Sequence, residues 1–526
     1  MDLFETASFT AIIILQTVLD ELRNRSLPLY NRLRSMMTTE SKRIYIFHNE
    51  FRAETFVKRE PSETINDRND RAIRESAKWY KRHLMKSLRG TNVRVPEIVL
   101  LTMDKANLTR ASKEGISACS ISEYVGQFED AESLLDMISA SEGYERRKVK
   151  RGENIYPEYY SSARIQAGIQ SQTLHSGVIT ISPYNFLEAT VSNPSPDGKP
   201  YLIVGRENIN RAVHGDVVAI QLLPESEWRG QTETIVEEGD VAGIENPDAD
   251  EEDPAVEHEV DAKERKILLD TEKTKPKSLQ MTAKVVGIIK RNWRTYVGHI
   301  DPSSVPPSAS TSRTPTTVFL LPLSKQIPKI RIRTRRPHLL LNQRILVSID
   351  TWDATSRYPE GHFIRSLGTL ETREAETEAL LIEWDVIYRA FSEKVLKCLP
   401  EEGHSWKVPD VLPPSRQDFR DRLVCSIDPP GCQDIDDALH SRQLDNGNFE
   451  IGVHIADVTH FVKPATPMDD EAKLRGTTVY LVDKRIDMLP MMLGTDLCSL
   501  VSERDRYSVS VLWACSTWEI VLTFRK

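Results

Sequence analysis

The stretch "DPPGCQDIDDAL", from Asp428 to Leu439, places four carboxylates within ten residues. Apolar residues lie between and beside these acids, and the run "FEIGVHIADV" that follows at residues 449–458 has the pattern of a buried strand. Like charges repel at this spacing, and an unpaired carboxylate loses favourable hydration when it is buried. The loop therefore either stays solvated or holds something that offsets its negative charge.

Two interpretations of this loop follow from its residues. The run "PPG" is a turn signal, so a solvated surface turn is the first. The second is a site for Mg²⁺ or Mn²⁺, because hard cations prefer carboxylate oxygens. Two such ions about 4 Å apart would clamp the attacking and leaving oxygens of a phosphodiester, which explains four carboxylates better than one ion does. A calcium-binding EF-hand is excluded, because Leu439 stands where that loop needs glycine.

Three runs in this part of the chain resemble a known family. They are "DPPGCQDIDDALH" at residues 428–440, "GVHIADVTHFV" at 452–462 and "RGTTVYLVDKRIDMLP" at 475–490. Together they closely resemble the catalytic domain of the RNase II (RNB) family of 3'→5' exoribonucleases, in the branch associated with the eukaryotic RNA exosome. The resemblance implies Mg²⁺-dependent hydrolysis of RNA from its 3' end, with nucleoside 5'-monophosphates as products.

The resemblance also implies roles for individual residues. Asp436 is needed for hydrolysis, and Tyr480 stacks on the terminal nucleotide, which suits an enzyme that tolerates many sequences. The implied Mg²⁺ ligands are Asp428, Asp434 and Asp437. Two nearby histidines, His454 and His460, lie in strand-like sequence, and we expect structural roles for them.

Two β-rich regions, residues 168–224 and 281–368, consist of short β runs broken by Pro, Asn and Gly, as in small barrels. The second holds "KRNWRTY" (290–296) and "KIRIRTRR" (329–336), in which basic residues alternate with aromatic or apolar ones. An ordinary solvated strand would show the same alternation. Basic side chains beside stacking aromatics are also what an OB-type single-strand binder uses, and the family resemblance implies two such cold-shock domains. The predicted RNA-binding residues are Tyr480, Arg291, Trp293, Arg331 and Arg333.

The first 125 residues alternate apolar strands with amphipathic helices, which predicts an α/β layer with a largely parallel sheet. The expected strands are "AIIILQTVL" (11–19), "RIYIFHN" (43–49) and "EIVLLTMD" (97–104). A long helix is expected over residues 66–88, where apolar residues recur at a spacing near 3.6.

Three acids in this region, Glu21, Asp70 and Asp104, are expected at a helix start, a helix start and a strand end. Taken singly each suits a structural role, and Asp70 could cap its helix. Their surroundings resemble a PIN endonuclease domain, in which acids at these places bind Mn²⁺ or Mg²⁺. That family has a further essential aspartate upstream of the position of Glu21. The chain starts after that position, so we expect an incomplete site.

The 526 residues predict three or four domains. The six cysteines form no Cys-x-x-Cys pair, which indicates a reducing compartment and neither disulfides nor zinc. The apolar stretch at residues 9–19 is too short to span a bilayer. Thirteen acids and no Lys or Arg lie in residues 233–261, and removing their charge from the net −9 leaves a mildly basic +4. Such a segment is expected to be disordered.

We therefore predict a multidomain α/β plus β protein with a PIN-like α/β domain, two OB-fold barrels and a partial α+β RNB domain. The expected boundaries are 1–125 (PIN-like), 126–167 (linker), 168–224 (first cold-shock domain), 225–280 (acidic disordered insertion), 281–368 (second cold-shock domain), 369–417 (helical connector) and 418–526 (N-terminal part of the RNB domain).

The resemblance implies an exoribonuclease of the RNA exosome that acts in RNA processing and decay. Its expected partners are single-stranded RNA and exosome core subunits, without membrane or DNA, in the nucleus (including the nucleolus) and cytoplasm. Relative to the family we expect a form truncated at both ends. The alternative is a non-catalytic RNA-binding or scaffold protein that retains the OB-fold domains.

Overall fold

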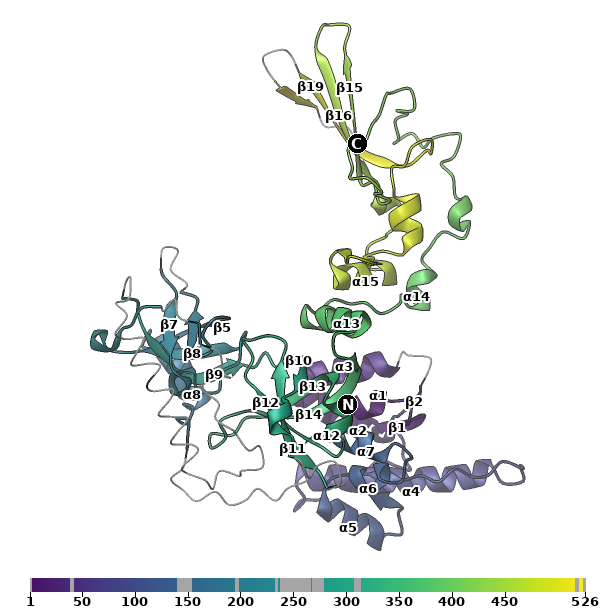
Figure 1. Ribbon diagram of the computed structural model, residues 1–526. Helices are drawn as coiled ribbons and strands as arrows, with labels where there is room; N and C mark the ends of the chain where they lie inside the picture. The colour runs from purple at the N-terminus through teal and green to yellow at the C-terminus, as the bar shows by residue number, and fades with distance from the viewer. Residues whose placement is uncertain are drawn as a thin grey trace. The chain divides into compact units, whose positions relative to one another are not determined.

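The computed structural model describes residues 2–37, 42–139, 154–193, 198–231, 235–236, 266, 279–306, 314–515 and 520–523. The chain forms two compact units, Met1–Glu383 and Trp384–Lys526. Figure 1 shows the ribbon and labels its helices and strands where there is room. Within the described ranges, no helix is both long and apolar enough to cross a membrane.

The N-terminal region of the first unit is an α/β layer. Its strands pair in parallel, as predicted, but they form two separate two-stranded sheets, β1–β2 and β3–β4. The expected first strand is shorter than predicted, because the helix α2 already begins at Gln16. The elements are α1 (Asp2–Glu5), β1 (Ala11–Leu15), α2 (Gln16–Arg25), α3 (Leu27–Met37), β2 (Arg43–Phe47), α4 (Ile65–Ser87), β3 (Leu100–Leu101), α5 (Lys105–Lys113), β4 (Ala118–Cys119), α6 (Ile121–Val125) and α7 (Ala131–Asp136).

The first β domain is a five-stranded sheet in the order β7-β6-β5-β8-β9. Its elements are α8 (Ser162–Gln170), β5 (His175–Ile181), β6 (Glu188–Val191), β7 (Tyr201–Val204), α9 (Arg206–Ile209), β8 (Val217–Leu222) and β9 (Ala283–Lys290). The predicted boundary at residue 281 is wrong, because β9 pairs with β8 of this sheet. The acidic segment is thus inserted between two hydrogen-bonded neighbours.

The second β domain is a closed barrel in the order β10-β11-β12-β14-β13. Its strands are β10 (Thr295–Ile300), β11 (Thr316–Pro322), β12 (Ile330–Thr334), β13 (Gln343–Thr351) and β14 (Glu360–Thr369), with α12 (Pro337–Leu340) between β12 and β13. The alternation predicted for β12 is confirmed, since Ile330 and Ile332 are buried while Arg331 and Arg333 are only partly covered. This strand therefore presents arginines outside an apolar barrel core.

The α/β layer packs directly on this barrel, and their buried apolar residues form one core. Asp136, at the end of α7, is fully buried and accepts a hydrogen bond of 2.7 Å from Thr334 Oγ1. The guanidinium of Arg335 lies 3.2 Å from the same carboxylate. Nearby, His362 Nδ1 lies 2.9 Å from Asp350 Oδ1, and its Nε2 lies 3.7 Å from Asp2 Oδ2. Paired polar groups thus fix the contact between layer and barrel.

The second unit contains a four-stranded antiparallel sheet in the order β15-β16-β19-β20. The expectation that β16 is a buried strand is half right, since one face is buried while Ile451 and Ile455 on the other are 39% and 45% exposed. The unit's elements are α14 (Glu393–Leu396), β15 (Asp437–Gln443), β16 (Phe449–Ala456), α15 (Pro467–Arg475), β17 (Val479–Tyr480), β18 (Arg485–Ile486), η8 (Met492–Leu497), β19 (Ser508–Cys515) and β20 (Ile520–Thr523).

The expected helical connector over residues 369–417 is only partly helical. It contains α13 (Arg373–Glu383) and the short α14, and the residues between them are irregular. Asp385 adopts a left-handed backbone conformation with φ of 52°, which ends the helical path directly after α13. Most of the segment predicted to be disordered lies outside the described residues, namely residues 237–265 and 267–278. Residues 140–153 of the expected linker also lie outside them.

Candidate active site

The aspartate loop is held from both sides by backbone hydrogen bonds. Cys425 and Leu439 exchange two of them, of 2.9 and 2.7 Å, at the base of the loop. The Ile435 amide donates to Ser499 Oγ at 2.9 Å, and Ser499 is completely buried. The Ala456 amide on β16 donates to the Asp436 carbonyl at 2.9 Å. The base of the loop is therefore fixed to the sheet edge, whereas its tip, residues 429–431, is an exposed turn as the first interpretation predicts.

Asp434 is the most strongly bonded acid of the loop. Its carboxylate accepts a short hydrogen bond from the Tyr480 hydroxyl and lies 3.2 Å from the Arg485 guanidinium. Partial burial favours the neutral acid, but the Tyr480 hydrogen bond and the charge of Arg485 outweigh it and lower the pKa of Asp434. Asp434 is thus held ionised.

Asp436 behaves in the opposite way. Loss of water on one side of its carboxyl, followed by the charges of Asp434, Asp437 and Asp428, raises its pKa. The charges of the other three acids therefore act on Asp436. Asp436 thus binds a proton more readily than Asp434 does. That all four carboxyls form one metal site stays a prediction.

The Asp428 carboxyl has one oxygen, Oδ2, that is buried and lacks a hydrogen-bond partner. Such an atom is costly unless a donor or a cation meets it. A carboxylate oxygen left open beside three further carboxylates fits the ligand chemistry of Mg²⁺. Across the described residues, however, no group of three His, Cys, Asp or Glu side chains is arranged to enclose an ion.

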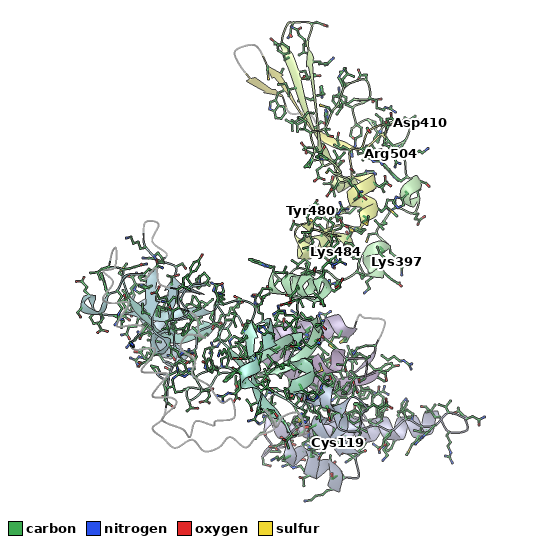
Figure 2. The ribbon with its side chains drawn as sticks, in the orientation of Figure 1. Cys119, Lys397, Asp410, Tyr480, Lys484 and Arg504 are labelled. Carbon is green, nitrogen blue, oxygen red and sulfur yellow. The ribbon has the colours of Figure 1, made fainter. Side chains whose placement is uncertain are left out.

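Tyr480 stands at the entrance of the acid cluster. It ends β17, at the short turn that leads through Lys484 into β18, and Figure 2 labels both residues. The residue is 65% exposed although its hydroxyl is tied to Asp434, and this hydrogen bond raises the pKa of Tyr480 to about 12. Its ring is therefore oriented by the cluster yet open for stacking.

The two histidines near the loop have the buried surroundings expected of structural residues. His454 Nε2 lies 2.7 Å from His440 Nδ1, and its Nδ1 lies 2.7 Å from Ser510 Oγ. His460 packs against the rings of Trp406 and Tyr507. Burial lowers the pKa of both His454 and His460. Neither ring is bonded to an acid of the loop in any described contact.

The three acids of the N-terminal region line one cavity of about 1170 Å³. Burial raises the pKa of Asp70, and the negative charges of Asp104 and Glu21 raise it further. The three acids therefore lie within electrostatic reach of one another. The idea that Asp70 caps its helix is wrong, because Thr64 caps α4 and Asp70 lies inside it. Glu21 likewise lies within α2, whereas Asp104 ends the β3 segment and caps α5.

Amide N–H groups of two asparagines donate hydrogen bonds to these three acids. Asn69 Nδ2 donates to Glu21 at 2.6 Å, and Asn107 Nδ2 donates to Asp70 at 3.0 Å. The backbone N–H of Asn107 donates to Asp104 Oδ1 at 2.9 Å, the bond by which Asp104 caps α5. Neutral amides thus compensate the carboxylates of this cavity, and metal binding there stays a prediction.

The basic residues predicted to bind RNA have different surroundings. The Arg291 guanidinium lies 2.9 Å from the buried Asp216 carboxylate, and it stacks 4.7 Å above the Trp293 ring. Both therefore have partners within the protein, and their role in RNA binding stays a prediction. Arg331 and Arg333 project from β12, away from the barrel core.

Two residues of the site were not predicted from the sequence, Arg485 and Ser499. Arg485 lies within the quoted run at residues 475–490, where its position opposite Tyr480 in a hairpin could have indicated it. Ser499 carries no local signal, because its contact with Ile435 joins residues 64 apart in sequence.

Profiles of four domain families match the chain, in the order PIN domain (residues 1–122), Rrp44-like cold shock domain (153–292), Dis3-like cold-shock domain 2 (317–385) and RNB domain (416–522). The exosome complex exonuclease dis3 of Schizosaccharomyces pombe is 50% identical over 513 residues, which cover 96% of this chain and 50% of that relative. The chain belongs to the Dis3-like branch of the RNB family. The predicted fold class is thereby confirmed, and the match at 153–292 includes β9 in the first cold-shock domain.

Other Dis3-like proteins give the same result. Human exosome complex exonuclease RRP44 is 42% identical over 516 residues, covering 98% of this chain and 51% of the relative. The chain spans about half the length of the curated relatives it matches. The solved structure of yeast Ssd1, a pseudonuclease, matches 71% of this chain and 45% of its own at 19% identity and a TM-score of 0.48. Nucleases of the RNB and PIN families generally depend on divalent metal ions.

Proposed function

We propose that this Dis3-like chain carries the hydrolytic site of a Mg²⁺-dependent 3'→5' exoribonuclease that acts in RNA processing and decay. The observation that carries the proposal is the cluster in which Asp436 lies among Asp428, Asp434 and Asp437, with the exposed Tyr480 hydrogen-bonded to it. The proposed partners are single-stranded RNA and core subunits of the exosome, and the proposed locations are the nucleus, including the nucleolus, and the cytoplasm. The names of the relatives support the assignment to the exosome.

Tyr480 positions the 3' end of the RNA. Its exposed ring offers a stacking face for the terminal base, worth about 1–3 kcal/mol per base. The hydroxyl bond to Asp434 fixes the ring next to the acids, so that the stacked nucleotide places its phosphodiester beside Asp436. Arg485 holds Asp434 from its other oxygen and keeps that carboxylate in place.

Asp436 serves as the proton acceptor. Its raised pKa makes it a stronger base than Asp434, and general bases work best when their pKa approaches the operating pH. It takes a proton from the water that attacks phosphorus. The bond between phosphorus and the 3' oxygen of the preceding nucleotide then breaks, that oxygen takes up a proton from solvent, and a nucleoside 5'-monophosphate departs.

Asp428, Asp434 and Asp437 would hold Mg²⁺, and the open Asp428 Oδ2 is the strongest structural reason. Bound there, the ion supplies positive charge that acidifies water and neutralises the phosphate. A non-catalytic RNA-binding scaffold is the second candidate. It is favoured by the lack, among the described residues, of three side chains that already enclose an ion.

The test uses a 5'-labelled single-stranded RNA with a free 3' hydroxyl, incubated with the chain and Mg²⁺. We expect the RNA to be shortened from its 3' end. Asp436→Asn should lower the rate of degradation at least a hundredfold while it changes the RNA affinity less than about twofold. Asp445→Asn is the matched control, because Asp445 is an exposed acid in the turn between β15 and β16. Unchanged degradation by Asp436→Asn would refute the assignment. RNA binding without either hydrolysis or Mn²⁺ binding by paramagnetic resonance would favour the scaffold.

A further inference from the structure

The basic residues of the helix α4 and the chain that follows it fall into two groups. In the first part of α4, Arg68, Arg71, Arg74 and Lys78 each form an ion pair with a glutamate of the same domain. The stretch "KRHLMKSLRGTNVRVP" at residues 81–96 has five basic residues and no acid. All five are exposed, and none forms an ion pair within the described part of the chain: Lys81, Arg82, Lys86, Arg89 and Arg94. The positive charge of this stretch is therefore uncompensated.

This basic stretch makes little contact with the rest of the domain. Every residue from 81 to 97 is exposed except two partly covered leucines, and Figure 1 shows this end of α4 extending away from the α/β layer. A cation in the last turn of a helix favours the negative end of the helix dipole, which gives Lys86 a structural role. The other four basic residues lie before that turn or beyond the helix. The fold itself thus does not account for most of this charge.

A stack of three rings reaches the same part of α4. Phe47 is buried, and the Trp79 ring stacks on it with centroids 4.9 Å apart. His83 stacks on Trp79 at 4.6 Å with only 9° between the ring planes, and the Arg52 guanidinium lies 4.5 Å from the Trp79 centroid. His83 is exposed and has no further ring contact or hydrogen bond among the described residues. The stack therefore ends in a planar ring with one open face.

The open ring and the free cations share one face of α4. Arg82 and His83 follow Trp79 by three and four residues, and Lys86 follows them by four and three, so these side chains are neighbours on the helix surface. Tyr45 is 51% exposed and lies on the same side of β2 as the buried ring of the stack, two residues away. Within the described ranges, none of these side chains lines the cavity of the three N-terminal acids. The face is therefore a separate surface.

Free cations beside an open ring indicate single-stranded nucleic acid as the partner. Lysines and arginines contact backbone phosphates, and a base of any identity stacks on an aromatic face. Bases inside a duplex are already paired and stacked, so a duplex cannot use the ring. An acidic polypeptide would pair with the charges but leave the open face of His83 unused.

We propose that residues 79–94 form an additional contact surface for single-stranded RNA. Phosphates lie along Arg82, Lys86 and Arg89, and one base stacks on the outer face of His83. The surface shares no residue with the aspartate loop or with the three N-terminal acids, and it tolerates many sequences. The choice of RNA over DNA rests on the proposed function, whereas the binding itself needs no hydrolysis.

The first test maps the contact on the unmodified full chain. A single-stranded RNA of about thirty nucleotides that contains 4-thiouridine is bound without divalent metal ions, so that it stays intact, and is then photocrosslinked. We expect crosslinked peptides from residues 79–94, and a base-paired RNA of the same length should give at least tenfold fewer. Absence of crosslinks from this stretch overturns the proposal. Because no hydrolysis is measured, failure of the proposed exonuclease activity leaves this test intact.

A charge variant tests the phosphate contacts. The combined change of Arg82→Gln, Lys86→Gln and Arg89→Gln should lower crosslinking at residues 79–94 at least tenfold. It should also reduce the slope of log K against log salt by about 2, since each phosphate contact of a single strand contributes about 0.7. The matched control removes three exposed cations from α2, α3 and α5 of the same domain, by Arg23→Gln, Arg34→Gln and Lys113→Gln. Equal effects of the two triple variants contradict the proposal.

The ring and the class of partner are tested separately. His83→Ala should weaken the affinity for the RNA at least fivefold, whereas His83→Phe, which keeps a stacking face, should stay within about twofold. Poly-glutamate of the same total charge should displace the RNA from residues 79–94 at least tenfold less well than unlabelled RNA does. Equal losses in the two His83 variants, or equal displacement by poly-glutamate, would show an acidic-peptide surface and overturn the assignment to RNA.

Discussion

At the scale of single residues, Tyr480 combines two roles that a substitution can separate. Tyr480→Ala removes both the ring and the hydroxyl bond to Asp434, whereas Tyr480→Phe removes only the bond. We expect Tyr480→Ala to weaken the affinity for a short 3' single-stranded RNA by roughly 5- to 100-fold, the loss of about 1–3 kcal/mol of stacking. Tyr480→Phe should stay within about threefold. Fluorescence anisotropy measures both, and equal losses in the two variants would show that the ring does not stack.

His362 makes the stability of the first unit depend on pH. Burial disfavours its charged form, but hydrogen bonds to Asp2 and Asp350 outweigh this and raise the pKa of His362 to about 9. An unfolded histidine titrates near about 6.5, so this stabilisation is complete below about pH 6.5 and is lost as the pH rises through about 9. We expect the free energy of unfolding to fall by up to about 3 kcal/mol across that interval.

Urea titrations at pH 6 and pH 9.5 measure this fall. His362→Gln should flatten the dependence, and His338→Gln, at an exposed site on α12, should keep it. A dependence that persists in His362→Gln would assign the titration to another group.

At the scale of elements, a buried carboxylate supplements the apolar contacts that attach the helix α7 to the second cold-shock barrel. Burial raises the pKa of Asp136 despite its bonds to Thr334 and Arg335. These bonds therefore offset only part of the cost of burying the carboxylate charge. We expect Asp136→Ala to lower the free energy of unfolding by about 2 kcal/mol, less than for a fully buried pair because Arg335 keeps access to water. Thermal denaturation should show no such loss for Glu132→Ala, on the exposed side of the same helix.

The local sequence pattern predicted which helices and strands form better than it predicted which strands lie side by side in a sheet. The alternation in β12, the long helix α4 and the parallel pairing all follow from periodicity within a few residues. Sheet membership of β9 does not, because a run of apolar residues says that a strand forms but not which edge it joins. The functional residues follow the same rule. The four acids are close in sequence and could be predicted, whereas Ser499 is distant in sequence from Ile435, and Asp216 is distant from its partner Arg291.

At the scale of the whole molecule, opposite charges are separated along the chain. Thirteen acids lie in residues 233–261, while Arg331 and Arg333 project from the second barrel. We expect deletion of residues 237–265 to leave the affinity for single-stranded RNA unchanged or to raise it, because that segment repels phosphate. The combined change of Arg331→Gln and Arg333→Gln should reduce the slope of log K against log salt by about 1–2.

Filter binding from low to moderate salt gives these slopes. Arg373→Gln, an exposed arginine paired with Glu374 on α13, should leave the slope unchanged. Affinity that does not vary with salt would exclude phosphate contacts as the source of binding.

The acidic insertion between β8 and β9 has a consequence for how the chain is made. The sheet of the first cold-shock domain stays one strand short on the ribosome until residue 290 has been synthesised, because β9 pairs only after the whole insertion has emerged. The closure entropy of such a connection grows slowly, about 0.6 kcal/mol per doubling of its length. Evolution can therefore lengthen or shorten the insertion at little cost. A protease cut within it leaves two fragments still joined through the β8–β9 ladder, and the two could be produced separately and reassembled as a split protein.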